Sequence, residues 1–508
     1  MEGYIIHYLK TIKDIQELRD KEGVFKDFVN NVESFISYIK AKKRETVVEI
    51  LQICRRLRDL GAPIEGYKIM KADAEYYLSK GIDRNYWQNL YFAYAFANLG
   101  YPTPTIEKEL RQKIKDLKRS KFPEFIPLFL NAYGNIFHIY RQDYVVAREL
   151  YDEALKSIEK IDRKRFVEIT NREWDWAYKL IVNSFIDLLL SIERNEKDEK
   201  ILDRLFEIIK ENSESSSYIR LLSRLNQTEI YIARDKIEEA ENLVKRMLKD
   251  TPKELDRYLM PSANRLRGLI EAKKGNTDEA VKYCLAAFGN SSFFGNTLDE
   301  KYAIRSLIKT FRIMAANVPL EEKVAFYKDK GLFDSFLEIL RLKDWYLGEE
   351  HSQSVSALSF RLADALGFSE KEKGLVKNAG LLHDIGKIMI PWFTLNKTSE
   401  LDELDWEIVY YHTIEGYRML NSLGLFKKAE VVRDHHERID GSGYTTGKKN
   451  IPITTEIVAI ADAYDASVTP NRRYKKIKSR EEAIREIEEG VRGKFSKKLI
   501  EALKKVST

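Results

Sequence analysis

A helical pattern that repeats along the first half of the chain constrains its fold more than any other feature. At residues 230–240 an amphipathic pattern ends in a short polar turn, and a new apolar stripe follows at helical spacing. Similar successions occur at residues 269–288 and 192–209, each offset by roughly 40 residues, and an out-of-phase copy starts at Tyr140. Repeats of this length are typical of stacked helical hairpins. We therefore predict a helical-hairpin solenoid, with an ordinary helical bundle as the alternative.

Composition favours the same all-α architecture. The 508 residues include only 24 Gly and 11 Pro, fewer than the usual roughly 7% and 5%, so the turns of β-rich structure are scarce. A small residue recurs in the second helix of each hairpin, which resembles tetratricopeptide repeats, although their period is shorter. Such arrays present a concave surface, and we expect a peptide, protein or small signal molecule to bind there.

Two breaks and a change in residue choice divide the chain. The first break is the Pro-containing segment 100–105 and the second is the segment 288–296, which is rich in loop-forming residues. The helical pattern that follows is interrupted at residues 317–319. We predict an N-terminal helical region over residues 1–100, tetratricopeptide-like repeats over 101–325 and an α-helical domain with a chemical function over 326–508. The boundary before the last domain is expected between Pro319 and Phe333.

The remaining composition argues against several classes of protein. Cys54 and Cys284 lie far apart and outside any CxxC motif, which excludes a disulfide framework and a zinc knuckle, and we expect two buried thiols. No apolar run approaches the roughly 18 residues of a membrane span. We expect a cytoplasmic protein that binds neither a membrane nor a nucleic acid polymer. The net charge is only +6, but residues 471–508 hold 13 Lys and Arg against 6 Glu, which would attract a phosphorylated ligand.

Histidine is concentrated in one segment. Five of the seven histidines lie between residues 351 and 436, including an adjacent His-Asp pair and an adjacent His-His pair: His351, His383, His412, His435 and His436. A single histidine on an apolar helix usually belongs to the core, but this grouping favours metal ligation. So many imidazoles, with nearby Asp residues, exceed the needs of one tetrahedral zinc and indicate two ions bridged by a carboxylate. Mixed nitrogen and oxygen ligands suit iron or manganese, with zinc possible.

The order of motifs from residue 333 to residue 480 resembles the HD-GYP family, a branch of the HD phosphohydrolases known as cyclic di-GMP phosphodiesterases. The matching segments are His351, 383–387 (HDIGK), His412, 435–438 (HHER), 440–444 (DGSGY), 451–452 (IP) and 461–466 (ADAYDA).

The resemblance implies a metal-dependent phosphodiesterase that opens cyclic di-GMP to the linear dinucleotide, and further to GMP in some cases, under control of the helical repeats. It implies two divalent ions, with these ligands: His351, His383, Asp384, His412, His435, His436 and Asp462. Asp384 would bridge the ions, Lys387 would contact the scissile phosphate, and Asp465 would lie behind the ligands. Substrate contacts are expected from Lys387, Arg438, Tyr444, Arg472, Arg473 and Lys475.

Three departures from the family bear on the substrate. The GYP triplet reads Gly443-Tyr444-Thr445, the loop that follows is about two residues short, and Leu347 stands where some members carry a third-metal Glu. The ligands are intact, but the altered loop leaves room for a second hypothesis, an HD hydrolase of another cyclic dinucleotide or nucleotide. A third hypothesis is a receptor that binds a ligand or a protein without turnover.

Overall fold

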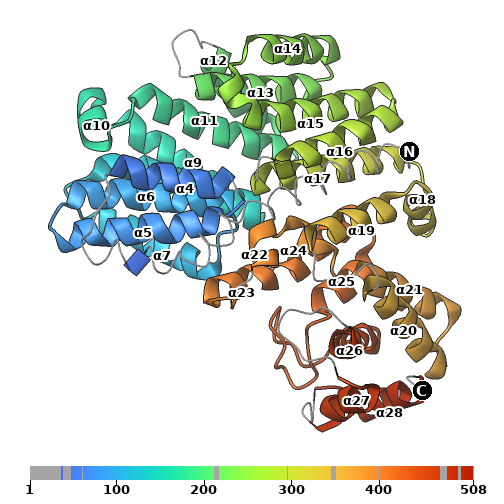
Figure 1. Ribbon diagram of the computed structural model, residues 1–508. Helices are drawn as coiled ribbons and strands as arrows, with labels where there is room; N and C mark the ends of the chain where they lie inside the picture. Colours follow the sequence, from blue (N-terminus) through green and yellow to red (C-terminus); the bar gives the residue numbers. More distant parts are fainter. Residues whose placement is uncertain are drawn as a thin grey trace. The chain divides into compact units, whose positions relative to one another are not determined.

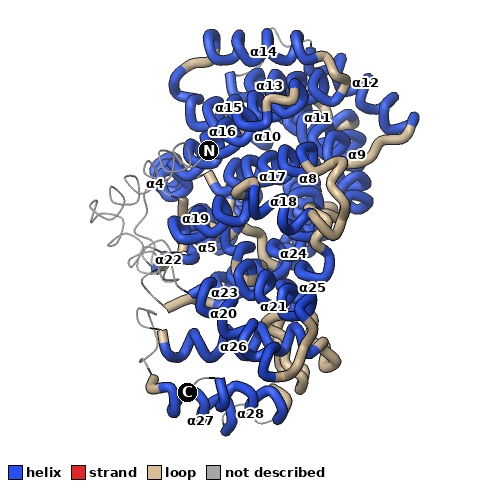
Figure 2. The backbone as a smooth tube through the Cα atoms, turned by 90° about the vertical axis from the view of Figure 1, so that its right-hand side faces the viewer, coloured by secondary structure: helices blue, strands red, loops and turns tan. Residues whose placement is uncertain are grey.

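The structure is a computed structural model that describes residues 36–37, 47–59, 61–210, 217–293, 296–344, 351–397, 400–469, 478–489 and 494–506. Every regular element in these ranges is a helix (Figure 2), which confirms the predicted all-α class. The chain divides between Thr310 and Phe311 into two compact units. The domain limits drawn from the sequence at residues 100 and 325 stay predictions.

The first unit consists of consecutive helical hairpins (Figure 1). Its helices are α4 (Val47–Asp59), α5 (Pro63–Ser79), α6 (Asp83–Leu99), α7 (Pro104–Leu117), η1 (Pro123–Phe125), α8 (Ile126–Asn135), η2 (Ile136–Arg141), α9 (Tyr144–Glu159), α10 (Arg163–Thr170), α11 (Trp174–Ser191), α12 (Glu196–Lys210), α13 (Ser217–Ala233), α14 (Ile237–Asp250), η3 (Lys253–Leu255), α15 (Asp256–Lys274) and α16 (Thr277–Phe293), and α17 (Thr297–Met314) crosses the division.

The repeated sequence pattern matches these hairpins. The polar turns at Gln142, Asp235 and Gly275 join α8–η2 to α9, α13 to α14 and α15 to α16, and all three residues adopt the left-handed backbone conformation that ends a helix. The apolar stripe from Ala240 to Met247 is buried between α13 and α15. The first helices of successive hairpins, α8, α11, α13 and α15, also pack on one another. This stacking confirms the solenoid, because each hairpin buries the apolar face of its neighbour.

The second unit is a smaller helical domain. Its helices are α18 (Lys323–Asp329), α19 (Leu332–Lys343), α20 (His351–Ala365), α21 (Glu370–Leu382), η4 (Ile385–Met389), α22 (Trp392–Asn396), α23 (Glu403–Tyr410), α24 (His412–Ser422), α25 (Phe426–Asp434), α26 (Ile453–Val468), α27 (Arg480–Glu489) and α28 (Lys497–Val506). Its core forms where α20, α21, α26 and α28 bury residues such as Leu362, Val376, Ile460 and Leu503. This core holds the ends of α20 and α21 against the middle of α26.

Two further expectations can be compared with the described residues. Cys54 and Cys284 are both buried and unbonded, as predicted. Among these residues, no helix has the length and apolar character needed to cross a bilayer.

Candidate metal centre

The candidate histidine ligands of the second unit lie at or next to the ends of its helices, whereas Asp462 lies within α26. His351 is the first residue of α20 and His412 the first of α24, whereas His383 directly follows α21 and His435 directly follows α25. The apolar residues before His383 predict a helix that continues through the His-Asp pair, but in the structure α21 ends at Leu382. After Leu382 the chain turns into η4, and this turn directs the side chains of both His383 and Asp384 into the cluster.

Four imidazoles are oriented by the same device. Nδ1 of His383 lies 2.8 Å from the main-chain oxygen of Gly380, and Nδ1 of both His412 and His435 lies 2.6 Å from the oxygen three residues earlier. Nδ1 of His351 lies 2.6 Å from Oδ2 of Asp465. Because an oxygen acceptor requires an N–H at Nδ1, Nε2 of His383, His412 and His435 is left as a lone-pair donor that can bind a metal, and Nε2 of His351 would become one on losing its proton.

The donor atoms form two outer groups and a third, overlapping group of His383, Asp384 and His435 that joins them. Possible ligand atoms of His351, His383 and Asp462 lie within 4.8 Å of one another, and so do those of His412, His435 and His436. Asp384 Oδ2 is 3.2 Å from Nε2 of His383, and Asp384 Oδ1 is 3.3 Å from Nε2 of His412. One carboxylate therefore turns a different oxygen toward each group, as a bridging ligand would.

The protonation states of the cluster suit a cation. Burial disfavours ionisation of Asp384 and Asp462, but the cationic and hydrogen-bonding neighbours, chiefly Lys387 and His351 respectively, outweigh it and hold the pKa of each carboxyl well below its usual value. Burial lowers the pKa of His412 to about 4 and that of His435 to about 3, so both imidazoles are neutral near pH 7. Ionised carboxylates and neutral imidazoles are the forms that bind metals.

Two buried histidines also show where a cation fits. Burial favours neutral His351, but hydrogen bonds with Asp462 and Asp465 outweigh burial and raise its pKa to about 9. A metal ion would replace the proton between His351 Nε2 and Asp462 Oδ1, which lie 3.3 Å apart. Nε2 of His383 is fully buried and makes no hydrogen bond. An orphaned buried nitrogen facing two carboxylates fits a metal ligand.

Lys387 lies beside the bridging carboxylate. Its Nζ donates a hydrogen bond of 2.9 Å to Asp384 Oδ2 and lies 3.3 Å from Oδ2 of Asp344, the residue that ends α19. Asp344 is 5% exposed. Sequence reasoning missed Asp344, since an acidic residue 40 positions before the HD pair carries no motif.

Gly386 brings the two halves of the cluster together. A Cβ atom at this position would lie 1.8 Å from the main-chain oxygen of His412. The backbones of η4 and α24 can therefore approach only because residue 386 has no side chain. This contact positions Asp384 close to His412.

A loop held by Glu437 adjoins the second group. The Glu437 carboxylate accepts hydrogen bonds from the main-chain N–H groups of Thr446 and Gly447 and from the Thr446 hydroxyl. Gly443 packs directly on the chain at residues 436–437, where a Cβ would lie 2.5 Å from Glu437 Cα. These contacts close the loop without the proline that the family carries after the tyrosine.

Tyr444 forms an aromatic surface beside the ligands. Its ring stacks on His436 with centroids 4.7 Å apart and on Tyr410 with centroids 4.0 Å apart. Tyr444 and Tyr410 are each 37% exposed, so the stack reaches solvent. Tyr410 was missed from sequence because nothing local links it to residue 444.

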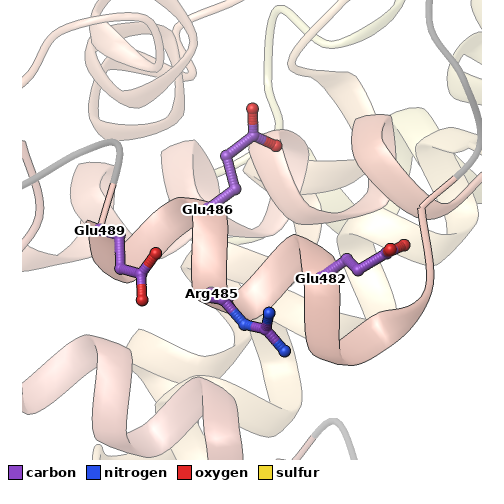
Figure 3. Close-up of a pocket in the computed structure, with 4 residues that line it drawn as sticks. All are labelled: Glu482, Arg485, Glu486 and Glu489. Carbon is purple, nitrogen blue, oxygen red and sulfur yellow. The ribbon is translucent and has the colours of Figure 1, made fainter.

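Of the other residues predicted to contact the substrate, Arg438 lies within the described part of the chain. Arg438 donates hydrogen bonds to the main-chain oxygens of His435 and Glu437, so in this structure its guanidinium supports the ligand loop. Arg472, Arg473 and Lys475 lie outside the described residues, as does Leu347. A separate hollow on α27 is lined by Glu482, Arg485, Glu486 and Glu489 (Figure 3); it contains none of the predicted site residues.

Comparison with known proteins agrees with the geometry. The family model described as HD domain matches residues 336–499. These residues form an HD domain. The HD domain thus contains every residue of both donor groups and the loop held by Glu437.

Curated relatives match the same part of the chain. A cyclic di-GMP phosphodiesterase of Thermotoga maritima is 44% identical over 195 residues, which are 37% of this chain and 52% of the relative. A 3'3'-cGAMP-specific phosphodiesterase of Vibrio cholerae is 40% identical over 159 residues, 30% of each chain. A cyclic di-GMP phosphodiesterase of Pseudomonas aeruginosa is 39% identical over 165 residues, 31% of this chain and 39% of the relative. The chain thus spans about half or less of the length of these relatives.

Proposed function

We propose that the HD domain holds two divalent metal ions, iron or manganese, and hydrolyses a phosphodiester bond of a cyclic dinucleotide. The observation that carries the proposal is the position of Asp384, whose two oxygens lie 3.2 Å and 3.3 Å from imidazoles of different groups. His351, His383 and Asp462 would hold one ion, and His412, His435 and His436 the other. When bound, two such ions supply Lewis acidity and a nucleophilic water at neutral pH.

The protein itself supplies orientation and charge. The acceptors at Nδ1 of His351, His383, His412 and His435 hold these four imidazole planes in place before any ligand arrives, so little reorganisation is needed. The Lys387 ammonium lies at the edge of the carboxylates and would face the negative charge that develops on the phosphoryl oxygens. Asp344 keeps this ammonium from turning away, since Lys387 lies between Asp344 and Asp384.

Tyr444 and Tyr410 support a nucleotide substrate. Their stacked, half-exposed rings adjoin His436, and a nucleobase stacks on such a surface with little dependence on its identity. A base bound there would bring its phosphate to the edge of the donor groups. The basic segment 471–478 would add contacts from Arg472, Arg473 and Lys475.

Cyclic di-GMP is the first substrate we propose, because two of the three relatives above are named for it. The second candidate is 3'3'-cGAMP, which the Vibrio cholerae relative is named for. The loop around Tyr444, which Glu437 and Gly443 shape without a proline, leaves room for this second substrate. We further propose that the helical repeats regulate this activity through a partner on their concave surface.

The experiment is a metal analysis followed by a substrate panel. The full chain, loaded anaerobically with Fe²⁺ or with Mn²⁺, is incubated with cyclic di-GMP, 3'3'-cGAMP and cyclic di-AMP, and products are separated by chromatography. We expect two ions per chain and linear dinucleotide from cyclic di-GMP. The variant Asp384→Ala should lose both metal and product, whereas Asp364→Ala, at an exposed position of α20, should keep them. Metal-loaded protein that binds a cyclic dinucleotide without product would indicate a receptor instead.

A further inference from the structure

A pair of hydroxyl groups joins the loop around Tyr444 to α24. Oγ1 of Thr445, which stands where the family carries proline, lies 3.2 Å from Oγ1 of Thr413, the second residue of α24. Thr413 is fully buried. The pair is separate from the hydrogen bonds that Glu437 accepts from the same loop.

The hydrogen bonds at Thr413 run in one direction. Its hydroxyl donates to the main-chain oxygen of Tyr410, the last residue of α23, at 3.0 Å. A threonine hydroxyl has one proton and two acceptor lone pairs, so the oxygen of Thr413 is left to accept from Thr445. Thr445 is therefore the donor, through a hydroxyl that a proline at this position would lack.

The partner of Thr445 lies next to a candidate metal ligand. His412 begins α24, and its Nδ1 lies 2.6 Å from the main-chain oxygen of Val409. Side chains of the first two residues of α24 thus bond to main-chain oxygens of the last two residues of α23, where helix carbonyl groups lack partners within the helix. These bonds hold the segment 409–413 in place, so it can anchor the loop.

A second link between the same two segments runs through aromatic rings. Tyr444 stacks on Tyr410 with centroids 4.0 Å apart and on His436 with centroids 4.7 Å apart. The ring stack and the hydroxyl pair involve adjacent residues of the loop, Tyr444 and Thr445. A stacked ring can slide over its neighbour, whereas a hydrogen bond is directional and fixes the main chain from which the ring projects.

We propose that Thr445 is a positioning residue, which through Thr413 holds the Tyr444 ring against His436 at the edge of the second donor group. Proline stiffens a loop because its ring fixes φ; here a hydrogen bond restrains the same position. The loop is then ordered before a nucleotide binds, which reduces the entropy lost on binding. The proposal rests on the proposed function for the identity of the ligand that Tyr444 contacts.

The kinetic test uses variants that differ by one hydroxyl. Thr445→Val keeps the shape of threonine without the donor, and KM for cyclic di-GMP should rise about 2- to 10-fold, the effect of one neutral hydrogen bond. We expect kcat and metal content to stay the same, because a contact made equally in the ground and transition states affects KM alone. Thr445→Ser keeps the hydroxyl and should restore KM.

Asn450→Ala, at an exposed position of the same loop, is the matched control for the kinetic test. Its KM and kcat should equal those of the unmodified chain. An unchanged KM in Thr445→Val, or an equal rise in Thr445→Ser, would overturn the proposal.

A double variant tests the assigned partner. Thr413→Val should raise KM at least as much as Thr445→Val, because it removes the acceptor of the same hydrogen bond. The double variant should then raise KM no further than Thr413→Val does. Two effects that multiply would show that the hydroxyls act independently and would contradict the link.

Hydrogen exchange separates this proposal from the proposed function. The N–H groups of Thr446 and Gly447 donate to Glu437, so their exchange reports opening of the loop. Without substrate, this exchange should be about 2- to 10-fold faster in Thr445→Val than in the unmodified chain and in Thr445→Ser. If this difference is found but no cyclic dinucleotide is hydrolysed, the proposed function fails and the role of Thr445 stands. Equal exchange in all three chains overturns that role.

Discussion

Nδ1 of His351 lies 2.6 Å from Oδ2 of Asp465, a residue 114 positions later in the chain. The same Asp465 oxygen accepts a 3.0 Å hydrogen bond from the Thr469 hydroxyl, so the carboxylate is itself held in place on α26. This pair fixes the imidazole that begins α20 and turns its Nε2 toward Asp462.

From this pair we expect Asp465→Ala to weaken metal binding although Asp465 is not a proposed ligand. Loss of a carboxylate behind a ligating histidine costs about 10–100-fold in metal affinity or activity. Metal content is measured after dialysis against graded chelator, with Asp364→Ala as the control. Metal affinity equal to that of the unmodified chain would show that Asp465 does not position His351.

Substitution of Lys387 should separate turnover from metal binding. Lys387→Met removes the ammonium beside Asp384 and should lower kcat about 100-fold, the loss seen when one donor to a developing oxyanion is removed. Metal content and KM should change little. Lys371→Met, at an exposed position of α21, is the control. A large rise in KM with kcat unchanged would assign Lys387 to substrate binding alone.

Gly386 and Gly374 should respond to alanine in opposite directions. Gly386→Ala places a methyl group against the main-chain oxygen of His412, so we expect a loss of about 1–3 kcal/mol or more in unfolding free energy, together with loss of metal. Gly374 lies within α21 with open space around its Cβ position, and Gly374→Ala should stabilise the chain by about 0.5–1 kcal/mol. Urea denaturation of both variants measures the difference, and equal stabilities would refute the close approach of η4 and α24.

The loop next to Tyr444 should depend on the charge of Glu437. Glu437→Gln replaces an acceptor oxygen by an amide NH₂ that faces the N–H groups of Thr446 and Gly447, and each unsatisfied donor costs about 1–3 kcal/mol. We expect KM for the cyclic dinucleotide to rise while metal content is retained. Steady-state kinetics and metal analysis check this together; loss of metal would mean that Glu437 supports the ligands and not the substrate loop.

Removal of metal should lower the stability of the HD domain. A ligand at 100 times its Kd stabilises the folded state by about 2.7 kcal/mol. Calorimetric scans with and without EDTA should therefore show one transition that shifts to lower temperature and recovers on addition of Mn²⁺. The transition of Asp384→Ala should be insensitive to EDTA, and an EDTA-dependent shift in that variant would place the metal elsewhere.

Much of the fold follows from local sequence. The stripe from Ala240 to Met247 and its repetition predict paired helices, because helical spacing and a polar turn are both short-range properties. The limits of the site elements were less predictable. His383 follows α21 because the next segment must approach α24 through Gly386, a contact with a residue 26 positions away. Tyr410 and Asp344 were missed for the same reason, since their partners are distant in sequence.

The sequence by itself determined the helical class and the residue types that can bind metal. Helical periodicity and side-chain chemistry are both properties of residues that lie close together in the sequence. Only the tertiary structure decided which oxygen of Asp384 faces which imidazole, and that Nδ1 of four of the five histidines is occupied by an acceptor. It also brought six asparagines from distant parts of the chain into one cavity. These relationships depend on helix packing between residues far apart in the chain, and packing is set by the whole core and not by any local pattern.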